Sequence, residues 1–415
     1  MTQVEKIRQE FPELGERVYG KPLVYLDNAA TSQRPFSVIR KWTEMSEKYN
    51  ANLHRAVHRI ADLATAEYEA TRDAVREYLN AAAREEIIFT AGATASINLV
   101  AFCFGEAFVR AGDEIVVSEA EHHSNIVPWQ MLCERKGATL KVLPVDDRGR
   151  LRLECLDSLL TPRTKLLCVA HISNVLGIVN PVREIARACH ARNCAVLVDG
   201  AQGIVHERVD VQDLGCDFYV FSGHKVYAAP GTGVLYGRRE LLEQMPPYMG
   251  GGEMIGTVRW SGTTYAPLPQ KFEAGTQNLA GTPTLRPALE WATALREPAV
   301  LENLDTIKSF ILNKLRSDKR FRLYGDPEDG KDKIPLFSFS VEHLHHEDLA
   351  LILDKMGIAV RSGQMCAEPL MDRFGVTGML RVSFAPYNTL QEAEYLMESL
   401  ERAIKMLEHG QRPLR

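Results

Sequence analysis

Short apolar segments recur along this chain, and helical patterns separate many of them. Two of these helical patterns are Asp62–Leu79 and Pro181–Arg192. Alternation of strands and helices predicts a mostly parallel sheet covered by helices on both faces, which is an α/β fold. The strand candidates are Val24–Asp27, Ile87–Thr90, Glu114–Ser118, Leu140–Val145, Lys165–His171, Ala195–Asp199, Phe218–Ser222 and Val234–Gly237.

The pattern changes after residue 285. The final helix opens with Thr389-Leu-Gln-Glu392, which has the form of a capping box. We expect a smaller α+β domain of residues 1–20 and 286–415, beside a large domain of residues 21–285. Its expected elements are a long helical stretch over Leu285–Leu315, strands over Pro335–Val341, Ala359–Arg361 and Leu380–Phe384, and a helix over His346–Met356.

Composition limits what such a protein binds and where it works. The chain has 415 residues, 45% apolar and 25% charged, which is ordinary for a globular protein with room for two domains. A net charge of −5 gives no indication of binding to nucleic acid or to a membrane surface. The N-terminus lacks a signal-peptide profile, and no apolar run approaches the roughly 18 residues that span a bilayer. The eight cysteines form no Cys-x-x-Cys pair, so we expect reduced thiols and a cytoplasmic location.

Two of the predicted strands end in residues that suit pyridoxal phosphate (PLP). Asp199 closes one strand, and Ser222, His224 and Lys225 stand at the end of the next. Ligands of open α/β sheets collect at the carboxyl ends of the strands. PLP needs an amine for its Schiff base, an acid against the pyridine nitrogen and donors for its phosphate. A lone lysine or aspartate in such a place is ordinary, but this combination predicts a PLP enzyme.

Three further loops follow predicted strands and carry polar groups to the same edge. Gly92 permits a tight turn before a helix, where free N–H groups and the Thr94 hydroxyl suit a phosphate; plain turn chemistry explains the same residues. A histidine in Glu119–Asn125 is placed to stack on the pyridine ring and move protons. Its alternatives are a surface residue or a metal ligand, although no third and fourth ligands stand at suitable spacing. Asn174 suits either a ligand contact or a turn.

One cysteine differs from the others because it lies in a glycine-containing loop. That loop is Arg361-Ser-Gly-Gln-Met-Cys366, and an exposed thiol close to Arg361 suits a nucleophile. Arg381 lies within an apolar strand further along the chain. Its guanidinium suits a substrate carboxylate, and an internal Arg–Asp pair is the alternative.

Six separate segments resemble the class V aminotransferase group in their order and spacing. More closely, the chain resembles cysteine desulfurases of the SUF type (group II) over residues 10–408. The Arg-x-Gly-x-x-Cys-Ala loop at 361–367 is short, as in that type, whereas the other cysteine desulfurase group carries a longer insertion there. The six segments are Tyr25-Leu-Asp-Asn-Ala-Ala-Thr31, Glu121-His-His-Ser-Asn-Ile-Val-Pro-Trp129, Asn174-Val-Leu-Gly177, Asp199-Gly-Ala-Gln202, Ser222-Gly-His-Lys225 and Phe272-Glu-Ala-Gly-Thr276.

The resemblance implies a PLP-transferase fold of type I, with a seven-stranded sheet in the large domain, and a cofactor site matched residue by residue. Lys225 would bind PLP covalently and move protons at the substrate Cα. Asp199 would face the pyridine nitrogen, Gln202 the phenolic oxygen, and His123 would stack on the ring. The implied phosphate contacts are Thr94, Ser222, His224 and, from the other subunit of an obligatory homodimer, Thr276.

The resemblance also implies the reaction. Asn174 and Arg381 would hold the substrate carboxylate, with Arg361 beside them. Cys366 would attack the sulfur of L-cysteine, which leaves L-alanine and an enzyme persulfide. The sulfur would pass to a SufE-like or SufU-like acceptor protein, for iron–sulfur cluster assembly or other sulfur transfer. No metal ligand is implied.

Two departures from the family pattern affect details rather than the reaction class. The family often has Thr-Thr-Glu or Ala-Thr-Glu where this chain has Ala93-Thr94-Ala95, and one or two histidines where it has Gln364-Met365. The alternative functions are a selenocysteine lyase or a specialised C–S lyase on the same fold. An ordinary aminotransferase would not need Cys366, and a non-catalytic scaffold would not need the lysine, aspartate and cysteine together.

Overall fold

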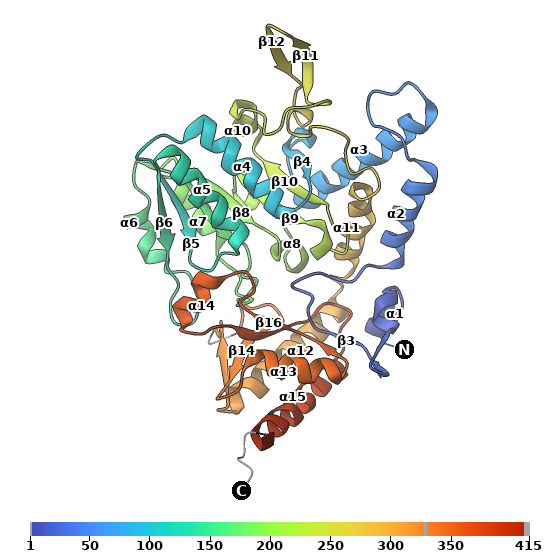
Figure 1. Cartoon of the computed structure of the whole chain (residues 1–415), viewed down its shortest axis with the longest axis vertical. Coiled ribbons are helices and arrows are strands. Elements are labelled where there is room, and N and C mark those ends of the chain that lie inside the picture. The colour runs from blue at the N-terminus through green and yellow to red at the C-terminus, as the bar shows by residue number, and fades with distance from the viewer. Residues whose placement is uncertain (1, 328–329, 411–415) are drawn as a thin grey trace.

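A seven-stranded sheet forms the centre of the larger part of the molecule (Figure 1). The structure, a computed structural model, describes residues 2–327 and 330–410. Neighbouring strands run parallel, except that β10 pairs antiparallel with both of its neighbours. In spatial order the strands are β4 (Ile87–Thr90), β10 (Gly233–Gly237), β9 (Phe218–Ser222), β8 (Ala195–Asp199), β7 (Thr164–Ala170), β5 (Glu114–Ser118) and β6 (Thr139–Leu143).

Helices cover both faces of this sheet, so its central strands are apolar along nearly their whole length. On β7, Leu166 and Cys168 belong to the core under α4 and α5, whereas Leu167 and Val169 belong to the core under α3 and α7. The predicted α/β fold with a mostly parallel sheet is confirmed. The helices of this part are α2 (Phe36–Lys48), α3 (Arg59–Leu79), α4 (Ala93–Phe108), α5 (Val127–Lys136), α6 (Leu156–Leu159), α7 (Val182–His190), α8 (Gly203–His206), α9 (Val211–Leu214), α10 (Arg239–Gln244) and α11 (Leu285–Ala294).

A second, four-stranded antiparallel sheet forms the C-terminal part, with helices packed against it. The predicted capping box is present, since Thr389 and Glu392 each accept a hydrogen bond from the other's backbone N–H. The strands in order are β13 (Phe321–Tyr324), β14 (Leu336–Val341), β17 (Met379–Ser383) and β16 (Arg361–Gly363). The helices of this region are α12 (Pro298–Ser317), α13 (His346–Lys355), α14 (Glu368–Phe374) and α15 (Leu390–Gly410), and the short α1 (Gln3–Arg8) touches α12.

Three predicted elements differ from the structure. The single helical stretch from residue 285 is two helices, because Pro298 opens α12 and cannot supply the N–H that would continue α11. The predicted strand at 359–361 spans the ends of two strands in different sheets, β15 (Ile358–Ala359) and β16. The first strand candidate, shortened to β3 (Val24–Tyr25), pairs with β15 and lies outside the large sheet. The domain boundaries stay a prediction.

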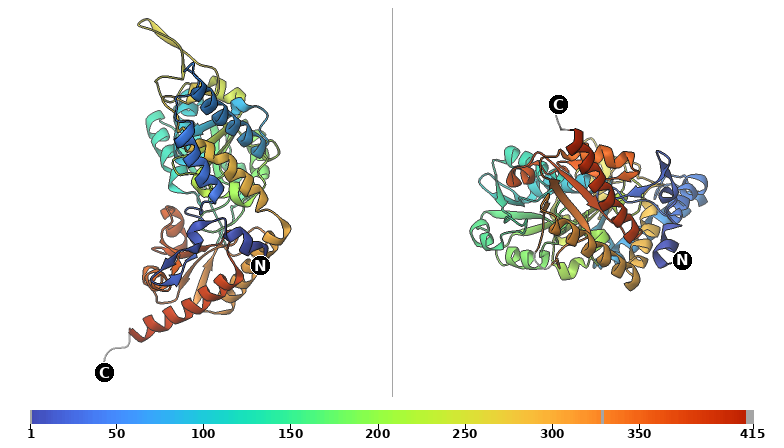
Figure 2. Two further views of the ribbon diagram at one scale, coloured as in Figure 1. Left: turned by 90° about the vertical axis from the view of Figure 1, so that its right-hand side faces the viewer. Right: turned by 90° about the horizontal axis from the view of Figure 1, so that it is seen from below.

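A hairpin that the sequence did not predict projects from the end of the molecule opposite α15 (Figures 1 and 2). It consists of β11 (Ile255–Arg259) and β12 (Gly262–Tyr265), and its tip exposes the whole side chain of Trp260. A short pair of strands, β1 (Arg17–Val18) and β2 (Lys21–Pro22), lies near the N-terminus. None of the described helices is both long and apolar enough to cross a membrane.

Candidate active site

One cavity of about 300 Å³ lies at the carboxyl ends of the central strands, closed on one side by the C-terminal part. The side chains that the sequence placed in the site come from both parts of the molecule and meet here. All of them line this cavity except His123 and Thr276. The lining residues among those predicted are Thr94, Asn174, Asp199, Gln202, Ser222, His224, Lys225, Arg361, Cys366 and Arg381.

Asp199 and Lys225 face the cavity from neighbouring strand ends. Asp199 is the last residue of β8, and its Oδ1 accepts a hydrogen bond from the Ala201 N–H at 2.9 Å. Burial raises the pKa of Asp199, and the positive charge of Lys225 opposes that rise. Burial lowers the pKa of Lys225, which Asp199 opposes and Arg381 reinforces. A lowered lysine pKa increases the fraction of neutral amine, the form that attacks a carbonyl carbon.

Another part of the cavity wall is built from the turn before α4 and the end of β9. The Ser222 hydroxyl accepts a hydrogen bond from the Ala93 N–H at 2.8 Å, so the serine is fixed against the first turn of the helix. Gly92 has φ +151°, and a Cβ on Gly233 would lie 2.3 Å from the Gly92 Cα. This close approach brings Thr94 and Ser222 to one wall of the cavity. The arrangement fits a phosphate at a helix N-terminus.

His122, rather than His123, lines the cavity. Burial, assisted by the charge of Lys225, lowers the pKa of His122 to about 4, so this ring is neutral at pH 7. The neighbouring His123 lies outside the lining, and its Nε2 accepts a hydrogen bond from the Glu368 N–H at 3.0 Å. Of the two adjacent histidines, the structure therefore brings His122, and not the predicted His123, to the wall of the cavity. The sequence could not separate two adjacent histidines, because the loop conformation decides which one faces inward.

The loop that carries Cys366 is held in an unfavourable backbone conformation. Met365 and Cys366 have φ values of +54° and +56°, a left-handed region that costs an L-residue roughly 1–2 kcal/mol each. The Asn174 side-chain amide donates to the Met365 carbonyl at 2.9 Å, and the His123 N–H donates to the Cys366 carbonyl at 2.8 Å. Cys366 is the one exposed cysteine of the eight. Its thiol therefore lies on a braced loop at the edge of the cavity.

Arg381 brings a buried guanidinium to the cavity from β17. It is 3% exposed, its Nη2 lies 3.0 Å from Asp27 Oδ1, and its Nη1 donates to the Asn174 carbonyl at 2.8 Å. The internal Arg–Asp pair, an alternative from the sequence, is thus present. Its Nε is buried and has no hydrogen-bond partner among the described residues. Arg361 lies nearby, half exposed, with its Nη1 3.9 Å from Asp27 Oδ2. The site therefore has positive charge beyond what Asp27 neutralises.

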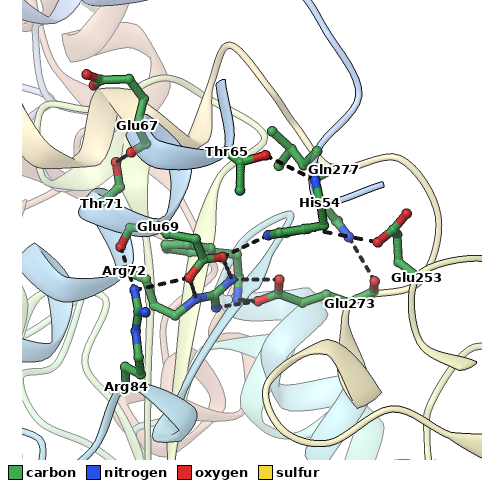
Figure 3. Close-up of polar contacts among 12 residues, drawn as sticks. His54, Thr65, Glu67, Glu69, Thr71, Arg72, Arg84, Glu253, Glu273 and Gln277 are labelled. Carbon is green, nitrogen blue, oxygen red and sulfur yellow. Dashed lines mark hydrogen bonds and ion pairs between the residues drawn. The ribbon is translucent and has the colours of Figure 1, made fainter. Parts of the chain in front are cut away.

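Two other predicted residues are placed as follows. Gln202 donates through Nε2 to the Ala29 carbonyl at 2.7 Å, which joins the end of β8 to the segment after β3. Thr276 is exposed and lies outside this cavity. Its segment is anchored by Glu273, which forms a two-pronged ion pair with the buried Arg72 (Figure 3). Among the described residues, no group of three or more histidine, cysteine, aspartate or glutamate side chains is arranged to hold a metal ion.

The fold and the site define a class of PLP enzymes, and comparison with known proteins agrees. Residues 24–396 match the family model for aminotransferase class-V. The chain therefore belongs to the class V aminotransferase family, whose cofactor is PLP. The Lys225 amine, the Asp199 carboxylate and the wall at Thr94 and Ser222 are a donor set that fits this cofactor.

Curated relatives and solved structures narrow the assignment. A probable cysteine desulfurase of Vibrio cholerae is 44% identical over 98% of this chain and 100% of its own length, and a cysteine desulfurase of Klebsiella pneumoniae is 46% identical over 97% and 99%. The crystal structure of the cysteine desulfurase CsdA from Escherichia coli is 38% identical, with a TM-score of 0.88 over 98% and 99% of the two chains. The structure of a cysteine desulfurase from Thermococcus onnurineus is 35% identical and has a TM-score of 0.89, over 98% of this chain and 99% of that chain. Within the class V family, the chain belongs to the cysteine desulfurases.

Proposed function

We propose that the protein removes sulfur from L-cysteine onto Cys366, with L-alanine as the other product, and passes that sulfur to an acceptor protein. One observation carries the proposal: the exposed Cys366 lines the same cavity as Lys225 and Asp199. The other seven cysteines are buried or half-buried, and none of them lines the cavity. The short loop at 361–367 supports placing the enzyme in the SUF type.

We assign the cofactor-binding roles to this chain's residues as follows. PLP, when bound, supplies the electron sink that stabilises negative charge at the substrate Cα. Lys225 would hold the cofactor covalently, and its amine would then take and return the Cα proton. Asp199 would hold a proton on the pyridine nitrogen, because a carboxylate beside a cationic ring favours charge on both groups. The remaining contacts are His122 at the ring face, Gln202 at the phenolic oxygen, and Thr94, Ser222 and His224 at the phosphate.

The substrate carboxylate would be bound by Arg381 and Arg361, which line the cavity from the C-terminal part. The free Nε of Arg381 is a buried donor that needs an acceptor, and a carboxylate supplies one. Arg361 would add charge from the rim, and Asn174 keeps Arg381 in place through its carbonyl. A substrate held by these arginines would have its side chain in the cavity that Cys366 also lines.

The sulfur step needs a second thiol. The Cys366 thiolate attacks the sulfur of the bound cysteine, so an S–S bond forms as the Cβ–S bond breaks. The electron pair of the broken bond stays with the substrate carbon, which is protonated and leaves as L-alanine. Cys366 keeps the transferred sulfur as a persulfide. The exposure of Cys366 lets an acceptor thiol reach this persulfide.

The assembly and the acceptor form the finer part of the proposal. Thr276 is exposed outside its own cavity, and we assign it to the phosphate end of a partner subunit's site in a homodimer. A SufE-like or SufU-like protein would accept the sulfur for iron–sulfur cluster assembly. We place the protein in the cytoplasm, where its eight cysteines would stay reduced. We keep the division into a large domain of residues 21–285 and a smaller domain formed by the rest of the chain.

Replacement of Cys366 tests the proposal. Wild type, Cys366→Ser and the matched control Cys155→Ser, a half-buried thiol away from the cavity, are each mixed with L-cysteine. Alanine and sulfide are measured with and without reductant, and mass spectrometry locates the added sulfur. We expect Cys366→Ser to retain PLP but to form no persulfide, whereas Cys155→Ser behaves as wild type. Wild-type turnover in Cys366→Ser would mean a simple C–S lyase.

A further inference from the structure

His123 contacts the Cys366 loop on both sides of Ala367. Its backbone N–H donates to the Cys366 carbonyl at 2.8 Å, and its ring Nε2 accepts from the Glu368 N–H at 3.0 Å. The Glu368 carboxylate also lies 3.7 Å from Nε2. One residue therefore holds the carbonyl of the reactive cysteine and the first N–H of α14. Its neighbour His122 faces the cavity instead.

The Cys366 loop depends on such external contacts. Two consecutive non-glycine residues in the left-handed region, Met365 and Cys366, do not keep that conformation by themselves. No strand or helix includes residues 364–367, which join β16 to α14. The Ala367 carbonyl accepts from the Leu370 and Met371 N–H groups of α14, and among the described residues the Met365 and Cys366 carbonyls are held by Asn174 and His123. Loss of either contact should let the thiol move relative to the cavity.

His123 is itself rigidly placed. The preceding Glu121 is fully buried, and its carboxylate accepts hydrogen bonds from the Ser118 hydroxyl, the Asn125 amide and the Ala170 N–H. Asn125 in turn accepts from the indole N–H of Trp129. This network ties the turn that contains His123 to the ends of β5 and β7, and Ala170 at the end of β7 also lines the cavity. The position of His123 relative to the sheet is therefore fixed, and His123 in turn fixes the cysteine loop that it contacts.

We propose that His123 is a positioning residue that holds the Cys366 thiol in line with the substrate sulfur, through the bond from the Glu368 N–H to its Nε2. The proposal rests on the proposed role of Cys366 as sulfur acceptor. His123 does not line the cavity in which cofactor and substrate would bind. The His123 ring acts as a hydrogen-bond acceptor at a fixed distance from the backbone. Another side chain with an acceptor at that distance should therefore replace the ring.

Three substitutions separate the acceptor from the bulk of the side chain. His123→Gln places an amide oxygen where Nε2 stands, His123→Asn places it about one bond length short, and His123→Leu removes it. All three keep the backbone N–H that donates to Cys366. Glu368→Gln is the matched control, because it removes the nearby charge and leaves the Glu368 N–H in place. If His123→Leu does not fold, the comparison of His123→Gln with His123→Asn still tests whether the position of the acceptor matters.

The first measurement is hydrogen–deuterium exchange of the PLP-loaded protein without substrate, followed by mass spectrometry of the segment at 366–374. Loss of one hydrogen bond should speed exchange of the Glu368 amide about tenfold. We expect this in the leucine and asparagine variants, and wild-type exchange in His123→Gln and Glu368→Gln. Equal exchange in all variants would show that the His123 ring does not hold the Glu368 N–H, which would overturn the proposal.

The second measurement separates positioning of the thiol from general damage. Solvent deuterium uptake at the Cα of L-alanine needs Lys225 and the cofactor but no thiol, so every variant should match wild type. Persulfide formation on Cys366 should fall about tenfold in His123→Leu, with KM for L-cysteine unchanged, and recover in His123→Gln. Faster exchange with an undiminished sulfur step would overturn the positioning role. Failure of the Cys366→Ser test would remove the sulfur role alone, because amide exchange is measured without substrate.

Discussion

Removal of one partner from the ion pair of Arg72 and Glu273 should destabilise the fold by several kcal/mol, because the remaining charge cannot reach water. The Arg72 side chain is 0% exposed and that of Glu273 is 1% exposed, with Nη1 to Oε1 at 2.7 Å and Nη2 to Oε2 at 2.9 Å. Arg72 also donates to the Ile87 carbonyl and lies against the Phe89 ring, its Cζ 4.6 Å from the ring centre. Arg72→Met keeps much of the volume and removes the cation.

The expected loss of folding free energy in Arg72→Met follows from the Glu273 carboxylate, which stays buried without its partner. Breaking a buried pair by removing one partner costs about 3–5 kcal/mol, since the other charge stays buried without compensation. Glu273 retains one donor, the Phe89 N–H at 2.7 Å, which favours the lower end of that range. For a chain of 415 residues, an unfolding entropy of about 2.1 cal/mol/K per residue converts this cost to a fall of about 3–6 °C in Tm.

Differential scanning calorimetry of the PLP-loaded protein measures this fall. Arg76→Met is the matched control, because Arg76 lies one turn further along α3 and pairs only at the surface with Glu77, where such pairs contribute about 0–1 kcal/mol. The double variant Arg72→Met/Glu273→Gln should recover much of the loss. A single variant no worse than the control would show that leaving Glu273 without Arg72 costs little stability, and a double variant no better than the single would show that the stranded carboxylate is not the cause.

The remaining predictions concern the cavity and the acid response. Borohydride should fix the mass of PLP on the peptide that contains Lys225, and a label on another lysine would contradict the assignment. Asp199→Ala should keep part of the PLP and lose most turnover; near-normal turnover would give the acid role to another group. Arg381→Lys should raise KM for L-cysteine strongly, because lysine lacks the planar fork, and an unchanged KM would remove Arg381 from the site. Burial lowers the pKa of His171 to about 4, below its unfolded value, so the stability it contributes is complete above pH 6.5 and is lost as the pH falls through 4. The loss is about 3 kcal/mol. The free energy of unfolding, measured with denaturant at several pH values, should therefore fall less steeply with decreasing pH in His171→Gln than in wild type. An equally steep fall in both proteins would contradict this.

The sequence was sufficient wherever local pattern decides structure. The strands that end at Asp199 and Ser222 match their predicted bounds, because apolar runs that stop at polar residues mark both ends. The site could be assembled from such strand ends, since the carboxyl edge of a parallel sheet gathers them. The roles of residues that lie far apart in the sequence followed from the resemblance to the class V aminotransferases.

The sequence was insufficient where distant contacts decide. The choice between His122 and His123 depends on a turn fixed by Glu121, and the pairing of Arg381 with Asp27 joins residues 354 positions apart. The break before Pro298 is different, because a proline at the start of a helix is a local signal in the sequence. The division of 358–363 between two sheets depends on β3, far away in the chain.

The order of these residues along the chain has a consequence for synthesis on the ribosome. The residues assigned here to hold PLP within one subunit lie between 94 and 225, so they leave the exit tunnel well before Cys366 and Arg381. A nascent chain can therefore build the cofactor half of the site before it possesses a reactive thiol. The early strand β3 must wait for β15 to find its partner. Completion of the C-terminal part thus brings the thiol, the arginines and the last strand pairing together, and a chain that stops short of it has no means to take up sulfur.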